Sequence, residues 1–147
     1  MEKKIGEVLG INISEKKGVA KEPILEGEFI ENFGLKGDAH AGKWHRQVSL
    51  LAQESINKMT EMGIGGLCSG RFAENITTKD IILHDLPVGT QLKIGETIQE
   101  ISQIGKECHN GCHIKETVGQ CIMPKEGIFT RVIKGGIIRV GDSIIKA

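Results

Sequence analysis

The chain has 147 residues, the length of one ordinary domain, with little room for two. Lysine plus arginine equals aspartate plus glutamate at 19 each, so the chain lacks the basic excess that nucleic-acid binding requires. Only 3% of the residues are aromatic, so the core must be built from isoleucine, valine and leucine. These side chains, together with 20 glycines, favour many short strands joined by tight turns.

No apolar run approaches the roughly eighteen residues that a membrane helix needs. The N-terminal sequence MEKKIGEVLG carries charges but lacks the apolar segment of a secretory signal. We therefore expect a soluble, cytoplasmic protein without membrane or nucleic-acid partners. Its four cysteines should be reduced, and thus free, metal-binding or chemically active.

The first half of the chain predicts strands, one long loop and one helix. In chain order these elements are strands over Lys4–Ile13, Val19–Ile24 and Gly27–Ile30, a loop over Asn32–Arg46, a strand over Gln47–Leu51 and a helix over Ala52–Met62. The helix is predicted because Ile56, Met59 and Met62 recur at three-residue steps, and Gly63 follows as a stop signal.

The second half predicts strands over Arg71–Thr77 and Ile81–Leu83, and one or two helical turns over Ile128–Lys134. Two segments share a form: GTQLKIGETI over Gly89–Ile98 and GGIIRVGDSI over Gly135–Ile144. Each places glycine, an acid and a hydroxyl residue between two apolar runs, which is typical of a tight hairpin. We expect the two units to pair within one structure.

These elements predict one mainly β (α+β) domain over residues 1–147. A flat open sheet would expose long strand edges to other chains, and closure into a barrel removes such edges. We therefore expect a closed or nearly closed β-barrel with one or two short helices.

Thiols are concentrated in the segment from Cys108 to Cys121, and three interpretations of this cluster are open. Buried apolar cysteines are the simplest, and they suit Cys121 and Cys68, which have apolar neighbours. A zinc site is the second, with the ligand set Cys108, Cys112, His113 and Cys121. A reactive thiolate is the third: Lys106 and His109 flank Cys108, and Cys112 could act as the resolving thiol.

Two further polar stretches are candidates for function. The loop GLKGDAHAGKWHR over Gly34–Arg46 combines charged and histidine side chains with glycines, and long ordered loops in compact domains often carry function. Within it, Asp38 is either a turn residue or, with His40, a metal or acid–base pair. The second stretch contains Arg71, Glu74 and Asn75. Strand alternation would place Glu74 on the opposite face from the other two, where a surface ion pair is the simplest interpretation.

Taken in order, these stretches resemble the MOSC family, the domain shared with the C-terminus of molybdenum-cofactor sulfurases. The resemblance spans nearly the whole chain. It rests on Gly34–His40, Arg46–Leu50, Gly70–Thr78, Leu86–Thr90, the central cysteine and the Gly136–Ile144 unit. It implies a strand-rich barrel, in agreement with the pattern of predicted strands.

The resemblance also implies a function. In such proteins one late cysteine carries sulfur as a persulfide or ligates molybdenum, and the matching position here is Cys108, preceded by Glu107 where the family usually has proline. The local thiol pattern, and not the resemblance, adds Cys112 as its companion in catalysis, in the role of resolving thiol. The molybdenum cofactor (molybdopterin) would be bound by Gly37, Asp38, His40, Arg46, Arg71 and Asn75.

The resemblance leaves three functions open. The leading one is a sulfur carrier or cofactor-handling protein, whose partner is a separate pyridoxal-phosphate cysteine desulfurase or a molybdoenzyme-maturation protein. The second is a molybdenum-dependent reductase of N-hydroxylated compounds, with Cys108 as the metal ligand. The third, which follows from the cysteine and histidine pattern alone, is a non-catalytic module stabilised by zinc.

Overall fold

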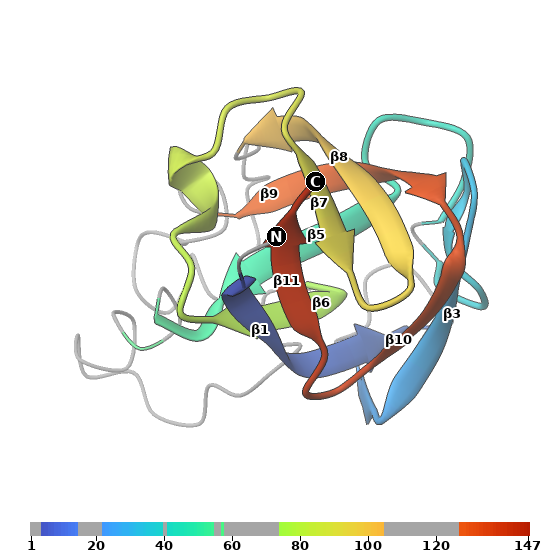
Figure 1. Ribbon diagram of the computed structural model, residues 1–147. Coiled ribbons are helices and arrows are strands. Elements are labelled where there is room, and N and C mark those ends of the chain that lie inside the picture. The colour runs from blue at the N-terminus through green and yellow to red at the C-terminus, as the bar shows by residue number, and fades with distance from the viewer. Residues whose placement is uncertain (1–3, 15–21, 40, 55–56, 58–73, 105–126) are drawn as a thin grey trace, which may run out of the picture.

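The fold is a closed β-barrel of seven strands with a small second sheet beside it (Figure 1). The computed structural model describes residues 4–14, 22–39, 41–54, 57, 74–104 and 127–147. Its elements are β1 (Lys4–Ile13), β2 (Glu22–Ile24), β3 (Glu26–Ile30), β4 (Gly34–Leu35), β5 (Val48–Ala52), β6 (Ile76–Lys79), the 3-10 helix η1 (Leu83–Asp85), β7 (Gln91–Ile94), β8 (Thr97–Ile104), β9 (Ile128–Lys134), β10 (Gly136–Arg139) and β11 (Ser143–Lys146).

The barrel strands follow the order β11-β7-β8-β9-β5-β6-β1, and β1 pairs again with β11 to close the ring. All these pairs are antiparallel except β5 with β6, which run parallel. The end of β1 also pairs with β2. The small sheet has the order β10-β3-β4, and Figure 1 shows β3 and β10 side by side at one flank of the barrel.

The barrel interior is filled by aliphatic side chains, as the scarcity of aromatic residues predicts. Its buried cluster includes Val8, Ile11, Val48, Leu50, Ile76, Leu92, Ile94, Ile101, Ile128 and Ile144. β-branched side chains of this kind pack well on pleated surfaces. Lys4 and Lys79 both contact the Glu7 carboxylate at the surface and hold the pKa of that group below its ordinary value, Lys4 most strongly.

The segment Ile128–Lys134 is a strand, so the prediction of helical turns there is wrong. Its residues alternate between buried and exposed toward its end, and β9 pairs with β8 on one side and with β5 on the other. Tertiary pairing on both edges thus overrides the ambiguous pattern of a short apolar run. The predicted strand Ile81–Leu83 is also wrong, because Leu83 begins η1 instead.

The first repeated unit forms the expected hairpin, since β7 pairs with β8 around Gly95. The second unit does not: β10 pairs with β3, while β11 pairs with β7 and β1. The turn around Gly141 bonds to β1, because Gly141 N donates to Val8 O and Val8 N donates to Asp142 O, both at 2.8 Å. This turn therefore carries the chain from the small sheet into the barrel.

The remaining predictions are confirmed in part. Lys4–Ile13 is a strand with the predicted bounds, and β5 lies one residue from its expected position. The loop Asn32–Arg46 contains the short strand β4. Gln53, Glu54 and Asn57 are helical, as the predicted helix Ala52–Met62 requires, and the rest of that helix and residues 71–73 of the strand predicted over Arg71–Thr77 lie outside the described residues.

Candidate functional site

The outer face of β5 and its neighbours is buried, although it points away from the barrel interior. Val48, Leu50 and Ala52 belong to the interior cluster, so Ser49 and Leu51 between them face outward. Leu51 is nonetheless fully buried, and Phe129, which lies opposite Ser49 in register, is 6% exposed. The described part of the molecule therefore has a second buried layer outside β5, and polar side chains are buried in this layer as well.

Asn75, directly before β6, joins β1 and β5 in this layer. Its side-chain oxygen accepts hydrogen bonds from Ser49 N at 3.0 Å and from Ser49 Oγ at 3.2 Å. Its side-chain nitrogen donates to Asn12 O at 3.3 Å, and its backbone carbonyl accepts from Asn12 N at 2.7 Å. The Asn75 amide is thus engaged at both ends by residues of β1 and β5, and its position is fixed.

Glu74 is a fully buried carboxylate, so the interpretation of a surface ion pair at this position is wrong. Thr77 Oγ1 accepts a hydrogen bond from Asn12 Nδ2 at 3.1 Å and donates one to Glu74 Oε2 at 3.0 Å. Strand alternation misassigns Glu74 because β6 begins only at Ile76, so the two-residue period does not extend back to it. The sequence feature that does mark this site is the polar pair Glu74 and Asn75 directly before a buried strand.

The loop from Gly34 to Arg46 is fastened to the end of β1 through Asp38. The Asp38 carboxylate, 7% exposed, accepts a hydrogen bond from Ser14 N at 3.1 Å. Ala39 N donates back to Ser14 O at 2.8 Å. Gly37 precedes this contact with φ of +88°, a conformation that favours glycine. Asp38 therefore positions the loop, and His40, its expected partner, lies outside the described residues.

Arg46 is half-buried against the strands that flank the thiol segment. Its guanidinium carbon lies 5.3 Å from the centre of the Phe129 ring, and its Nε donates to Gln103 Oε1 at 3.1 Å. No described residue accepts a hydrogen bond from its two Nη groups. The contact with Phe129 and the bond to Gln103 orient the guanidinium. Its Nη groups form the other end of a planar fork of donors, and such a fork suits phosphate and carboxylate groups.

The structure thus brings Arg46 and Asn75 to the same outer face. Asn75 binds Ser49, Ser49 lies opposite Phe129, and Arg46 covers the Phe129 ring. Gly37 and Asp38 belong to the loop that leads into this face. Within the described ranges, no three His, Cys, Asp or Glu side chains gather as metal ligands, and no helix is long and apolar enough to cross a membrane.

The thiol segment begins where this face ends. Ile104, at the end of β8, lies opposite Ile128, at the start of β9, so the chain leaves and re-enters the barrel at neighbouring positions. Cys108, Cys112 and Cys121 fall between them and, like Cys68 and Arg71, lie outside the described residues. The assignments of these residues to a site stay predictions.

The comparisons with known structures agree with the barrel fold. The YuaD protein from Bacillus subtilis is similar with a TM-score of 0.80 and 17% identity, over 99% of this chain and 97% of that protein. YiiM from Geobacillus stearothermophilus matches with a TM-score of 0.73 and 17% identity, over 97% of this chain and 75% of that one. YiiM from Escherichia coli matches with a TM-score of 0.64 and 17% identity, over 100% of this chain and 70% of that one.

At such low identity these likenesses show the fold. The comparison with curated proteins gives no match. The family comparison matches the family described as "MOSC domain" over residues 37–145, which span the loop of Asp38, the outer face of β5 and the thiol segment. The chain therefore belongs to the MOSC domain family.

Proposed function

We propose that this protein handles sulfur or the molybdenum cofactor through the thiolate of Cys108. The observation that carries the proposal is the family match over residues 37–145, which includes Cys108, Arg46 and Asn75 in one domain. MOSC domains are associated in general with the molybdenum cofactor. The geometry adds that Arg46 is bound to Gln103, one residue before the end of the strand that leads into the thiol segment.

In this proposal Cys108 acts as a nucleophile and then as a leaving group. Its thiolate attacks the outer sulfur of a persulfide on a cysteine desulfurase, forming a new S–S bond while the donor thiolate departs. An acceptor nucleophile then attacks the outer sulfur held on Cys108, and the Cys108 thiolate is released. The two transfers need no external oxidant or reductant. Pyridoxal phosphate belongs to the partner enzyme alone.

The described residues fit the cofactor in part. The Nη groups of Arg46 offer donors to the phosphate of a pterin cofactor, which would supply a dithiolene-bound molybdenum centre when present. Asn75 and Asp38 are committed to Ser49 N and Ser14 N respectively, so we assign them the support of the site and not direct anion binding. Gly37, exposed and next to Asp38, belongs to the rim.

The carrier role is tested by intact mass. Protein incubated with a cysteine desulfurase and cysteine should gain one sulfur atom, which a thiol reductant removes. Cys108→Ser should abolish this adduct, whereas Cys121→Ser should keep it. An adduct that survives in Cys108→Ser, or none in the native chain, would reject the carrier role.

A metal inventory of freshly purified protein separates the other two functions. Stoichiometric molybdenum or tungsten in protein made in a cofactor-competent host would favour the reductase or a cofactor carrier over a sulfur carrier. Stoichiometric zinc, with a large loss of stability on chelation, would favour the zinc-stabilised module. Protein equally stable after chelation would exclude that module.

A further inference from the structure

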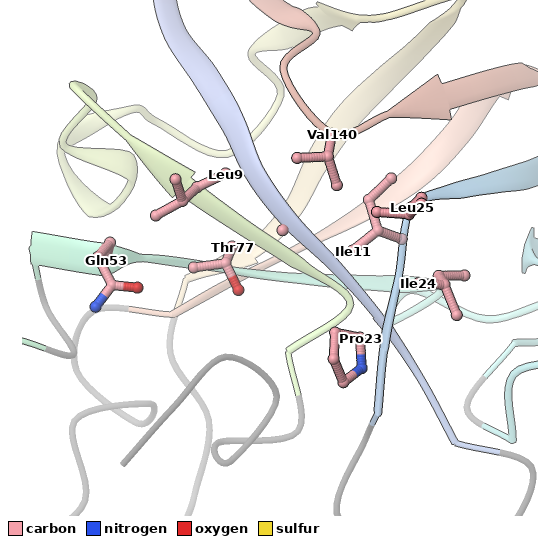
Figure 2. A pocket seen from close by; sticks show the side chains of 9 residues that line it. Leu9, Ile11, Pro23, Ile24, Leu25, Gln53, Thr77 and Val140 are labelled. Atoms are coloured by element: carbon pink, nitrogen blue, oxygen red, sulfur yellow. The ribbon is translucent and has the colours of Figure 1, made fainter. Parts of the chain in front are cut away.

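An apolar groove lies along β1, next to β2 and to the corner at Leu25 that joins β2 to β3. It has a volume of about 360 Å³, within the range of small-molecule pockets. Figure 2 shows its lining side chains on both sides of the β1 ribbon. The lining consists of Leu9, Gly10, Ile11, Pro23, Ile24, Leu25, Gln53, Thr77 and Val140.

The hollow has a local cause in β1. The register between β1 and β6 shifts between Val8 and Gly10, which marks a β-bulge that turns Leu9 outward. Gly10, opposite Thr77, contributes no side chain to the lining. The rim is apolar and accessible, since Leu25 is 82% and Val140 42% exposed. The groove is thus a concave site whose rim is apolar and exposed at Leu25 and Val140.

Among the described side chains that line the groove, one polar acceptor is available. None of the nine lining side chains is ionisable. Thr77 Oγ1 is already engaged by Asn12 and Glu74. Gln53 Nε2 donates to Asn57 Oδ1 at 3.0 Å, which leaves its Oε1 as the available acceptor. In Figure 2 that oxygen points toward Thr77 and the nitrogen points away.

We infer that this groove binds the hydrocarbon part of an uncharged small molecule whose polar end donates a hydrogen bond to Gln53 Oε1. A carboxylate or phosphate end is disfavoured, because none of the described residues that line the groove is cationic and burying an unpaired charge is costly. A primary amide or an alcohol on an aliphatic chain satisfies both requirements. This site uses no thiol, so it stands independently of the proposed sulfur chemistry.

The inference is tested with three probes that share one aliphatic chain. Octanamide carries the donor, N,N-dimethyloctanamide is neutral without a donor, and octanoate is charged without a donor. We expect octanamide to bind most tightly in a titration followed by amide resonances, with shifts centred on Leu9, Leu25 and Val140. Equal binding of all three, or shifts elsewhere, would overturn the inference.

Two variants locate the contact. Gln53→Met should weaken octanamide about fivefold, the worth of one neutral hydrogen bond, and leave N,N-dimethyloctanamide unchanged. Val140→Phe should fill the rim and weaken both, whereas Val88→Phe, at an exposed valine that does not line the groove, should weaken neither. If Val140→Phe folds and binds octanamide as the native chain does, the groove is not the site.

Sedimentation showing a dimer that Leu25→Glu dissociates would assign the groove to a second copy and also overturn the inference.

Discussion

Asn75 holds the outer face of β5 in place through hydrogen bonds made at both ends of its amide. Its amide oxygen accepts from both the backbone and the hydroxyl of Ser49, and its nitrogen reaches Asn12 on another strand. The side chain is 1% exposed, so water cannot replace these partners. Its contribution to the site is therefore inseparable from its contribution to stability.

Asn75→Ala should lower the free energy of unfolding by roughly 2–4 kcal/mol, because it removes three buried hydrogen bonds of the side chain at once. Urea denaturation followed by circular dichroism measures this change. Asn57→Ala is the matched control: it removes the bond with Gln53 at an exposed position and should cost less than about 1 kcal/mol. Equal losses in the two variants would contradict the structural role assigned to Asn75.

Arg46 should behave in the opposite way, with a small effect on stability and a large one on anion binding. Trp44, the single tryptophan of the chain, lies two residues away and is 40% exposed, so its fluorescence can report the titration. Inorganic phosphate should bind Arg46→Ala about tenfold more weakly than the native chain, as expected for the loss of a charged hydrogen bond. Arg131→Ala, at an exposed position of β9, is the control and should bind normally. Unchanged binding in Arg46→Ala would remove Arg46 from the proposed site.

At the scale of elements, the two repeated glycine-acid turns contact each other. Gly95 N donates to Ser143 O, and Glu96 exchanges hydrogen bonds with Ile137 through its backbone N–H and its carboxylate. Asp142 Oδ2 accepts from Arg139 N at 2.7 Å and lies 2.5 Å from the place that a Cβ on Gly95 would occupy. The repeat seen in the sequence is thus a packed pair of turns, although only one of them closes a hairpin.

This contact predicts different costs for two glycine substitutions. Gly89 and Gly95 both have positive φ, +97° and +55°, but only at Gly95 would an added Cβ meet other atoms within 4 Å. Gly89→Ala should cost about 1–2 kcal/mol from backbone strain alone. Gly95→Ala adds the clash with Asp142 and Ile137 O and should cost about 2–4 kcal/mol. Thermal unfolding of the two variants compares them, and a smaller loss for Gly95→Ala would show that the turns do not depend on their close approach.

The sequence predicts strands best where pattern and turn chemistry agree. β1, β5 and the β7–β8 hairpin lie close to their predicted places. Prediction fails where partners distant in the chain decide the outcome. IFTRVIK over Ile128–Lys134 is compatible with a short helix by pattern, and becomes β9 because β8 and β5 flank it. Likewise, no local signal shows that β10 pairs with β3 instead of with β11.

At the scale of the whole molecule, the family and the barrel can be predicted from ordered motifs, whereas the roles of individual site residues cannot. The motif containing Glu74 and Asn75 is visible in the sequence, but its burial and its contacts with two strands depend on β1 and β5 meeting at that point. The stacking of Arg46 on Phe129 is hidden in the same way, because the local pattern alone places Phe129 in a helix. Such contacts emerge only from long-range pairing.

The seam between β1 and β11 joins residues from almost opposite ends of the described chain, since Lys4 lies opposite Ile145. Contacts of such large sequence separation form slowly, because the entropy of closing the long loop must be overcome first. Until β11 arrives, the edges of β1 and β7 stay unpaired and can capture strands from other molecules. During synthesis the barrel therefore stays open until β11 emerges, and rapid closure after that point shortens the time in which these edges can aggregate.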